Sequence, residues 1–324
     1  MRTKQIFVFC FVVMFSSSSF STQGNEDGYH FLTQSRIIND ISFSPSGEVL
    51  YVTDHNAIKA FIFESQKVIR EFSDGHQAEI LSIAISSDST FMASGDRDGK
   101  ILIWNLRSGE IENTFDTHSG QILSLDISPD NGHLASGATD NTITLYDLSN
   151  MSAITTFKNF NDHITGVQFS PDGQWMVAVA ADGRVQLIDM NTKEVSSIQQ
   201  DTSFLRGLDF EPTSMVLKTV GDDGFVTNWG ISQGGFLHLR TIQKFSSNWL
   251  TSIQNTRSGN TFVVSNIRGQ IKVITPFSIL RKDLKVPVHK VIFRPGIEPN
   301  ILVVAATRGK GVIVIFGQDM KLGR

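Results

Sequence analysis

The chain has 324 residues, with 28 Lys and Arg, 32 Asp and Glu, and a formal net charge of −4. A chain of this length can bury a large core in one or two domains without disulfides. This total charge does not suggest binding to nucleic acid or to an acidic membrane. Charge is unevenly placed, because residues 257–324 hold 12 Lys and Arg against 3 Asp and Glu. The C-terminal end is therefore basic and the remainder acidic.

The first residues have the pattern of a secretory signal peptide. Arg2 and Lys4 precede an unbroken apolar run from Ile6 to Phe15, and the small residues Ser19 and Ser21 occupy the −3 and −1 positions of a cleavage site. This run is about half of the roughly 20 apolar residues that a membrane-spanning helix needs. We expect a signal peptide over 1–21, cleavage after Ser21, and export to the periplasm or the extracellular space.

The only cysteine, Cys10, lies inside this apolar run and would leave with it. The mature chain would then form no disulfide. Lipid attachment at Cys10 is the alternative, but Val8 and Phe9 are poor neighbours for it and the apolar run continues past Cys10. We therefore expect no membrane span in the mature chain.

Short β-rich segments recur about every 40 residues after the leader, bounded by Gly, Asp, Asn or Ser, and no stretch sustains a helical period. The clearest three units have their first β-rich segments at Ile80–Asp88, Ile122–Asp130 and Leu205–Pro212. Weaker copies begin near Ile37–Ser44, Ile164–Ser170, Leu250–Asn255 and Val288–Phe293. The repeat thus predicts seven units and an all-β fold.

The best units carry a recurring set of residues at fixed offsets. One has Gly75-His76, Asp98 and Trp104-Asn105, and the next has His118, Asp140 and Tyr146-Asp147. The turn F-S-P-D-G also recurs, as Phe43–Gly47 with Ser for Asp and as Phe169–Gly173. This pattern resembles the WD40 family.

The resemblance implies a seven-bladed β-propeller of four-stranded antiparallel blades, which disposes of open sheet edges by closing into a ring. We expect a linker over 22–28, the propeller over 29–316 and a short, loosely held tail over 317–324. The first strand, Tyr29–Gln34, should pair with Val312–Phe316 and so join the two ends of the chain in one blade.

In such blades the matching His, Ser, Asp and aromatic residues form a hydrogen-bond network between strands. By resemblance the networks here are His76, Ser94, Asp98 and Trp104, then His118, Ser136, Asp140 and Tyr146, and then Thr219, Asp223 and Trp229, with Asp201 in place of the histidine. His76, Ser94 and Asp98 are also the ingredients of a nucleophilic triad. Because the set repeats in the next blade, the structural interpretation is favoured. We predict that the chain is not an enzyme.

The sequence indicates no cofactor and no metal. Paired-ligand spacings such as H-x-x-x-H and C-x-x-C are absent, and His55, His163 and His289 fall in different units. Asp96–Gly99 and Gly221–Gly224 are too short for calcium loops and are better interpreted as turns. A convergent histidine cluster at the channel mouth is the alternative.

The residue just before each innermost strand should lie on one face, around the channel mouth, where loops concentrate binding residues. In order these are Ile37, Glu79, Gln121, His163, Phe204, Trp249 and Pro287. Ring closure groups the apolar members into one arc, near basic residues. The candidate partner-binding residues are Ile37, Phe204, Arg206, Trp249, Pro287 and Arg308. The alternative is that Phe204 and Trp249 are core residues between blades.

Three functions stay open. The first is a monomeric platform that binds protein partners, not nucleic acid, in the periplasm or outside the cell. The second is an accessory or assembly propeller of one exported enzyme complex, such as a periplasmic reductase. The third is a propeller enzyme acting on a small molecule or glycan, which would need convergent carboxylates or metal ligands at the channel mouth.

Overall fold

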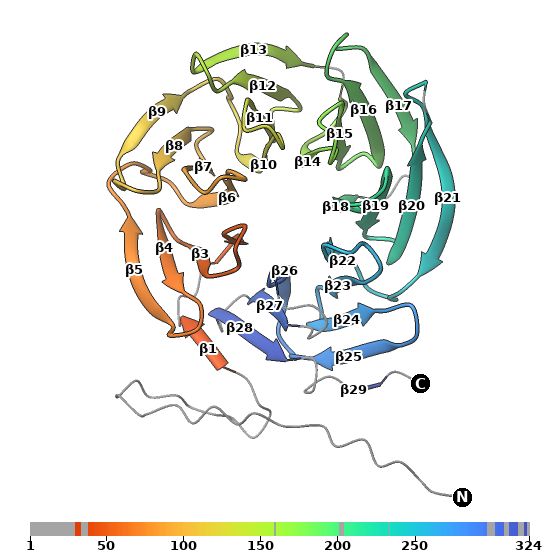
Figure 1. Ribbon diagram of the computed structural model, residues 1–324. Coiled ribbons are helices and arrows are strands. Elements are labelled where there is room, and N and C mark those ends of the chain that lie inside the picture. The colour runs from red at the N-terminus through yellow and green to blue at the C-terminus, as the bar shows by residue number, and fades with distance from the viewer. Residues whose placement is uncertain are drawn as a thin grey trace, which may run out of the picture.

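Seven antiparallel sheets stand side by side in a ring around a central channel (Figure 1) in the computed structural model. The structure describes residues 30–33, 38–158, 160–200, 204–232, 234–296, 302–307, 311–316 and 321–322. The predicted signal peptide (1–21) and linker (22–28) lie outside these residues. The predicted seven-bladed, all-β propeller is confirmed.

Six blades have four strands and blade six has five, and the innermost strand comes first in sequence among β2–β28 in every blade. Blade one is β2 (Ile41–Phe43), β3 (Val49–Asp54), β4 (Ala57–Ile62) and β5 (Lys67–Phe72). Blade two is β6 (Ile80–Ile85), β7 (Phe91–Asp96), β8 (Ile101–Asn105) and β9 (Ile111–Phe115). Blade three is β10 (Ile122–Ile127), β11 (His133–Ala138), β12 (Ile143–Asp147) and β13 (Ser152–Phe157). Blade four is β14 (Ile164–Phe169), β15 (Trp175–Ala180), β16 (Arg184–Asp189) and β17 (Val195–Gln199).

The C-terminal blades follow the same order. Blade five is β18 (Leu205–Phe210), β19 (Val216–Gly221), β20 (Phe225–Ile231) and β21 (Leu237–Lys244). Blade six is β22 (Leu250–Asn255), β23 (Phe262–Asn266), β24 (Gln270–Ile274) and β25 (Ile279–Asp283). Blade seven is β26 (Val288–Phe293), β27 (Leu302–Thr307) and β28 (Gly311–Phe316), completed by β1 (His30–Thr33).

The ring closes as the sequence predicted. β1 pairs antiparallel with β28, with His30 opposite Val314 and Thr33 opposite Val312. The expectation of a loose C-terminal tail is wrong in one segment, because β29 (Lys321–Leu322) adds a fifth strand to blade six. There Leu280 is opposite Leu322 and Arg281 is opposite Lys321. The outer edge of β25 offers unpaired backbone groups, which the tail satisfies.

The hydrophobic core lies between neighbouring blades. The second and third strands are apolar over nearly their whole length, as in β15, because both faces of the blade are covered by the next sheets. Outer strands such as β9 and β13 instead expose most of their residues. One core cluster joins Tyr51 and Phe72 of blade one to Met92 and Trp104 of blade two. The packing is continuous across the closure, where Val304 meets Ile41 in one cluster.

Tight turns leave each innermost strand on one face of the ring, which we call the lower face. In the F-S-P-D-G turn of blade four, the Gly173 amide donates to the Ser170 carbonyl, and Gly173 has a φ of 71°. Asn131 takes the equivalent place in blade three with a φ of 60°. Glycine and asparagine tolerate this left-handed conformation better than other residues do. The opposite, upper face holds the loops that lead into the innermost strands.

Adjacent blades are tied together around the channel by two tiers of side-chain-to-backbone hydrogen bonds. In the tier nearer the upper face, the amides of Ile83, Leu125, Val167 and Val291 donate to Asp40, Ser82, Ser124 and Ser252 respectively, at 2.9, 3.1, 3.0 and 3.3 Å. In the tier nearer the lower face, the amides of Phe169, Phe210, Asn255 and Phe293 donate to Asp126, Gln168, Asp209 and Gln254, at 2.7, 3.0, 2.6 and 2.6 Å. Each bond satisfies an amide on the open edge of an innermost strand.

Removing one of these hydrogen bonds between blades should destabilise the propeller measurably. Ser124→Ala leaves the Val167 amide without its side-chain acceptor, and we expect the free energy of unfolding to fall by about 1 kcal/mol. Urea denaturation at neutral pH measures this loss. Ser149→Ala, which removes an exposed hydroxyl that donates to Asp147, is the matched control. Equal stability of the two variants would contradict a stabilising role for the hydrogen bond between Ser124 and the Val167 amide.

Candidate functional site: the upper face and the channel

The polar network of blade two is fully buried. The Trp104 indole N–H donates to Ser94 Oγ at 2.7 Å, and Ser94 Oγ lies 2.6 Å from His76 Nε2. His76 Nδ1 lies 2.7 Å from Asp96 Oδ2. Because the indole can only donate, the consistent arrangement has the serine hydroxyl donating to Nε2 and Nδ1–H donating to the carboxylate. The network joins β7, β8 and the loop before β6.

The prediction that Asp98 belongs to this network is wrong, because Asp96 takes the position. Asp96 ends β7 with its side chain inside the blade, whereas Asp98 lies in the exposed turn and donates only its backbone amide to Asp96 Oδ1, at 3.0 Å. Burial acts to raise the pKa of Asp96, but the hydrogen bonds from His76 and the Lys100 amide outweigh it and the pKa is lowered. Asp96 is therefore a buried ionised partner of the histidine.

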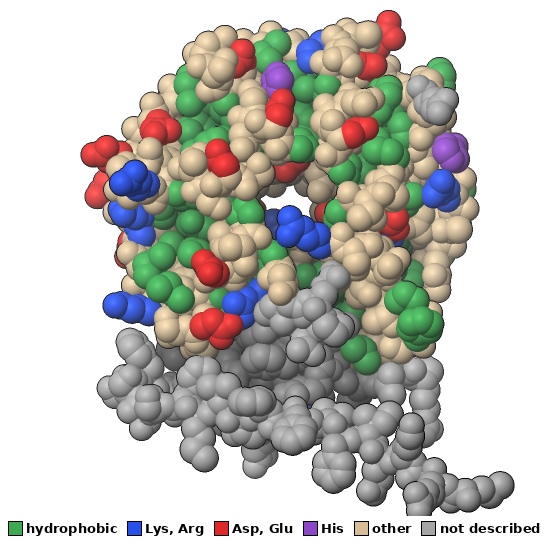
Figure 2. Space-filling model, in the orientation of Figure 1, with side chains coloured by type: hydrophobic (Ala, Val, Ile, Leu, Met, Phe, Trp, Pro, Cys, Tyr) green, Lys and Arg blue, Asp and Glu red, His purple; other side chains and the backbone are tan. Residues whose placement is uncertain are grey.

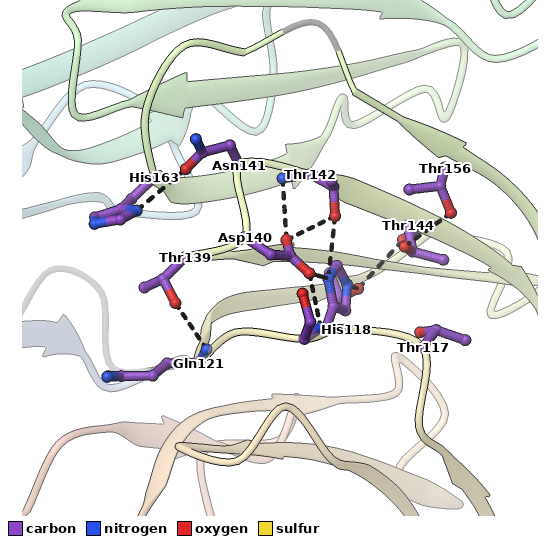
Figure 3. Close-up of polar contacts among 12 residues, drawn as sticks. Thr117, His118, Gln121, Thr139, Asp140, Asn141, Thr142, Thr144, Thr156 and His163 are labelled. Atoms are coloured by element: carbon purple, nitrogen blue, oxygen red, sulfur yellow. Dashed lines mark hydrogen bonds and ion pairs between the residues drawn. The ribbon is translucent and has the colours of Figure 1, made fainter.

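Blade three forms the predicted set of contacts. His118 Nε2 lies 2.6 Å from Ser136 Oγ, which lies 3.2 Å from the Tyr146 hydroxyl. His118 Nδ1 lies 3.0 Å from Asp140 Oδ2 (Figure 3). Ala138 occupies the position that Asp96 has in blade two. In blade three the carboxylate that contacts the histidine therefore comes from the following turn, as Asp140. Burial lowers the pKa of His118, although the adjacent carboxylate opposes this. The imidazole is thus held in its neutral form.

Blade five retains part of the network with a different partner. The Trp229 indole N–H donates to Thr219 Oγ1 at 3.0 Å, and Thr219 Oγ1 donates to Gln200 Oε1 at 2.6 Å. Asp201, expected in the place of the histidine, lies outside the described residues. Asp223 sits in the following turn, where its carboxylate accepts the Phe225 amide at 2.9 Å.

These networks are unsuited to nucleophilic chemistry. The His76 and Ser94 side chains are 1% and 0% exposed, so no substrate reaches the hydroxyl. Ser94 also accepts the indole N–H of Trp104, which holds the hydroxyl within the blade. The arrangement serves to join strands.

On the upper face, the structure brings three of the predicted partner-binding residues together. The Arg206 guanidinium carbon lies 4.6 Å from the centre of the Phe204 ring and 4.8 Å from that of Trp249. Arg206 also pairs with Asp222, with its Nη2 3.1 Å from Oδ2. We call Phe204, Arg206, Asp222 and Trp249 the upper-face cluster. Trp249 is 48% exposed, which contradicts its interpretation as a core residue.

The backbone around this cluster is closely fitted. A Cβ on Gly221 would lie 2.4 Å from the Phe204 carbonyl oxygen, so the loop before β18 requires glycine there. The Asp222 amide donates to that same carbonyl at 3.0 Å, and the Ile267 amide donates to the Trp249 carbonyl at 3.1 Å. Blades five and six therefore hold the cluster on fixed backbone rather than on a long loop.

Of the other candidates of the predicted arc, only Pro287 lies within the described residues. Pro287 is exposed immediately before β26. Ile37 and Arg308 lie outside the described residues. The exposed Arg268 follows Ile267 in the loop between β23 and β24, and so adds a basic side chain near Trp249.

The opposite side of the upper face is polar. The Asn39 amide group donates to Glu79 Oε1 at 3.0 Å, and Arg97 Nη1 lies 3.2 Å from Glu79 Oε2. His163 Nδ1 lies 3.2 Å from Asn141 Oδ1 (Figure 3). The two sides of the ring thus present different chemistry around one channel.

The channel itself carries charged groups that the sequence analysis missed. It is open through the centre of the ring, with acidic and basic side chains at its margin (Figure 2). Asp126 and Asp209 lie on the lower tier, and Lys290 pairs with Asp40 on the upper tier. Burial raises the pKa of Asp126 to about 7 and that of Asp209 to about 6. Alignment of the innermost strands could have predicted this pair, because Asp126 and Asp209 occupy the same position in β10 and β18.

The described part of the chain contains no group of three or more His, Cys, Asp and Glu that could hold a metal ion. Within the same residues, no helix is long and apolar enough to cross a membrane.

The family model of the IFT122 first beta-propeller matches residues 37–311. The chain belongs to this family. For this IFT122-type propeller, the resemblance to WD40 proteins is also confirmed by curated relatives. The guanine nucleotide-binding protein subunit beta of Schizosaccharomyces pombe is 32% identical over 68 residues, 21% of this chain and 22% of the relative. WD repeat-containing protein 1-B of Xenopus laevis is 33% identical over 91 residues, 27% of this chain and 15% of the relative.

The matched stretches span less than a quarter of the length of either relative. WD40 propellers generally act as protein-interaction scaffolds.

Proposed function

We propose that this chain is a non-catalytic platform that binds protein partners through its upper face, in the periplasm or the extracellular space. The observation that carries the proposal is the exposed Trp249 stacked with Arg206 and Phe204 at the rim of the channel. Trp and Arg are the residue types that most often dominate the energy of protein interfaces.

The cluster is preorganised for binding. Asp222 and two aromatic rings hold the Arg206 guanidinium, so little side-chain freedom remains to be lost when a partner docks. The ion pair also partly neutralises Arg206, which leaves a flat surface of aromatic carbon and spare N–H donors. A partner with an apolar group flanked by backbone carbonyls or a carboxylate complements this surface.

The proposal that the protein is exported rests on its N-terminal leader alone. The basic start, apolar run and Ser19–Ser21 cleavage pattern support passage across a membrane and removal of residues 1–21. N-terminal sequencing of the exported protein should begin at Thr22. An intact Met1 on the exported protein would contradict cleavage.

The upper face can be tested by quantitative affinity capture from the native host. Phe204→Ala combined with Trp249→Ala should reduce recovery of the specific partner at least tenfold, because both aromatic faces of the cluster are lost. Mass spectrometry of proteins captured by the wild type and by each variant measures this effect.

Phe277→Ala is the matched control, since Phe277 is 98% exposed and lies in the lower-face hairpin between β24 and β25. It should leave recovery unchanged. The melting temperature of the double variant should stay within about 2 °C of the wild type. Unchanged capture by the folded double variant would overturn the proposal.

A further inference from the structure

Blade five ends in an unusually long outer strand. β21 has eight residues, whereas the fourth strands of blades one, two, three, four and six have five or six. Among the described strands it pairs with β20 alone, and it lies on the outside of the ring (Figure 1). Seven of its eight residues are exposed. Its outward amide and carbonyl groups can therefore accept another strand.

The chain already uses the outer edge of a blade in this way. In blade six, β29 pairs with β25, with Leu280 opposite Leu322. Addition of an extended segment to a sheet edge is also a general mode of peptide recognition. The edge of β21 offers the same backbone groups over a longer stretch, and no described segment of this chain pairs with it.

Two basic side chains gather on one face of β21. A Cβ on Gly230 would lie 2.4 Å from His238 Nε2 and 2.9 Å from Arg240 Nε, so both side chains lie over Gly230. His238 is opposite Gly230 in the ladder, and Arg240 falls at the irregularity in its register. The equivalent residues of blades two, three and four are Asn105, Asp147 and Asp189. Glycine at this position therefore leaves room for the basic pair.

The positive charge of this strand is not neutralised. β21 contains His238, Arg240 and Lys244 and no acidic residue. Within the described part of the chain, no carboxylate forms an ion pair with Arg240 or Lys244. Glu211, which lines the same pocket as Arg240, pairs instead with Lys218. The strand therefore favours an acidic neighbour.

The other face of β21 is apolar. Leu239 and Ile242 are 56% and 54% exposed, and they stand opposite Trp229 and Thr227 on the face away from His238. On the basic face, Arg240 contributes to a pocket of about 350 Å³ between blades five and six. Side chains of an added strand would thus meet basic groups on one face and exposed apolar groups on the other.

We propose that the outer edge of β21 binds an extended acidic segment of a protein partner as a fifth strand of blade five. Acidic side chains of the added strand lie beside His238 and Arg240, and alternate apolar side chains lie beside Leu239 and Ile242. Charge argues against a second copy of this chain, because pairing two β21 strands would bring like charges together.

The test is fluorescence anisotropy on the full chain at pH 7.5 with labelled ten-residue peptides that are blocked at both ends. A peptide of alternating Glu and Val should bind saturably, and the same peptide with Lys for Glu at least tenfold more weakly. Two further peptides carry N-methyl groups on every Val or on every Glu. Only one of these should lose binding, because the amides of alternate residues point to opposite edges of a strand.

Reversing the charge of the strand should reverse its preference. Arg240→Glu combined with Lys244→Glu should weaken binding of the Glu peptide at least tenfold and allow binding of the Lys peptide. Lys67→Glu combined with Arg107→Glu is the matched control, because it makes the same charge change at exposed positions of blades one and two. It should bind the Glu peptide within twofold of the wild type. If a melting curve shows that the charge reversal unfolds the chain, Arg240→Gln with Lys244→Gln replaces it.

Hydrogen–deuterium exchange places the bound peptide. The Glu peptide should slow amide exchange within 238–244 and leave β13 unchanged. No saturable binding, equal binding of the Lys peptide, equal loss in the control variant, or loss with both N-methylated peptides would overturn the proposal. So would self-association of the chain that the charge reversal changes, since it would indicate a second copy. Phe204→Ala with Trp249→Ala should bind the Glu peptide as the wild type does, so failure here leaves the upper-face proposal unaffected.

Discussion

Replacing His76 by alanine is expected to lower the free energy of unfolding by about 3–5 kcal/mol, because it breaks a buried polar network. The Asp96 side chain is 1% exposed and would lose its histidine partner, and Ser94, at 0% exposed, would lose its acceptor. Neither group can turn to solvent. Urea denaturation at pH 7 measures the change.

The equivalent change in blade three should cost less. Asp140 is 12% exposed on its side chain and is also held by Thr142 Oγ1 at 2.7 Å and the Ser119 amide at 3.0 Å. His118→Ala therefore leaves the carboxylate with partners and access to water, and we expect a loss of about 1–3 kcal/mol. A His118→Ala variant less stable than His76→Ala would contradict this ordering.

Replacing Asp126 by asparagine should stabilise the protein at alkaline pH and change little at acidic pH. The folded-state pKa of Asp126 is about 7, against a usual value of 3.8. A carboxyl group with a raised folded pKa binds a proton more tightly in the folded state, so wild-type stability falls as the pH rises from about 4 to 7. The fall is at most about 1.4 kcal/mol per pH unit.

The difference between Asp126→Asn and wild type should therefore grow across this window and level off above pH 7, at about 2–4 kcal/mol. Asparagine retains an oxygen that can accept the Phe169 amide. Thermal melts from pH 4 to 8.5 measure the difference, and Asp172→Asn corrects for the change in net charge. A difference that does not vary with pH would refute the raised pKa.

Much of the fold followed from the sequence because the repeat offsets are regular. The seven innermost strands and the pairing of β1 with β28 were predicted from periodicity and the WD40 resemblance, and the structure confirms them. The tail was missed because Lys321 and Leu322 form a strand only by using the edge of β25. Two residues carry no periodic signal of their own.

The network residues show where assigning a residue in one blade from its spacing in another blade fails. The WD40 resemblance predicts Asp98, the acidic residue of the turn between the second and third strands, which stands 22 residues after His76 as Asp140 does after His118. In blade two, however, Asp96 at the end of β7 is the acidic residue that contacts the His76 imidazole. Similarly, Gln200 meets Thr219 in blade five, one residue before the predicted position.

Contacts between blades could be predicted only in outline, because ring closure placed Phe204 and Trp249 in one arc near basic residues without showing which side chains touch. The stacking of Arg206 between Phe204 and Trp249 depends on the spacing of β18 and β22 around the ring. The lower-tier hydrogen bonds from the Phe169 amide to Asp126 and from the Asn255 amide to Asp209 likewise depend on how neighbouring innermost strands meet at the channel. A single sequence fixes which residues alternate on a strand, but not which strands of different blades approach each other.

The central claim, that the upper face binds the partner, is tested most directly by hydrogen–deuterium exchange of the chain with and without the captured partner. We predict slower amide exchange at 204–207 and 248–251, which surround the upper-face cluster, and unchanged exchange in the lower-face turn at 170–175. Protection confined to the lower-face turns or to outer strands such as β13 would contradict the account.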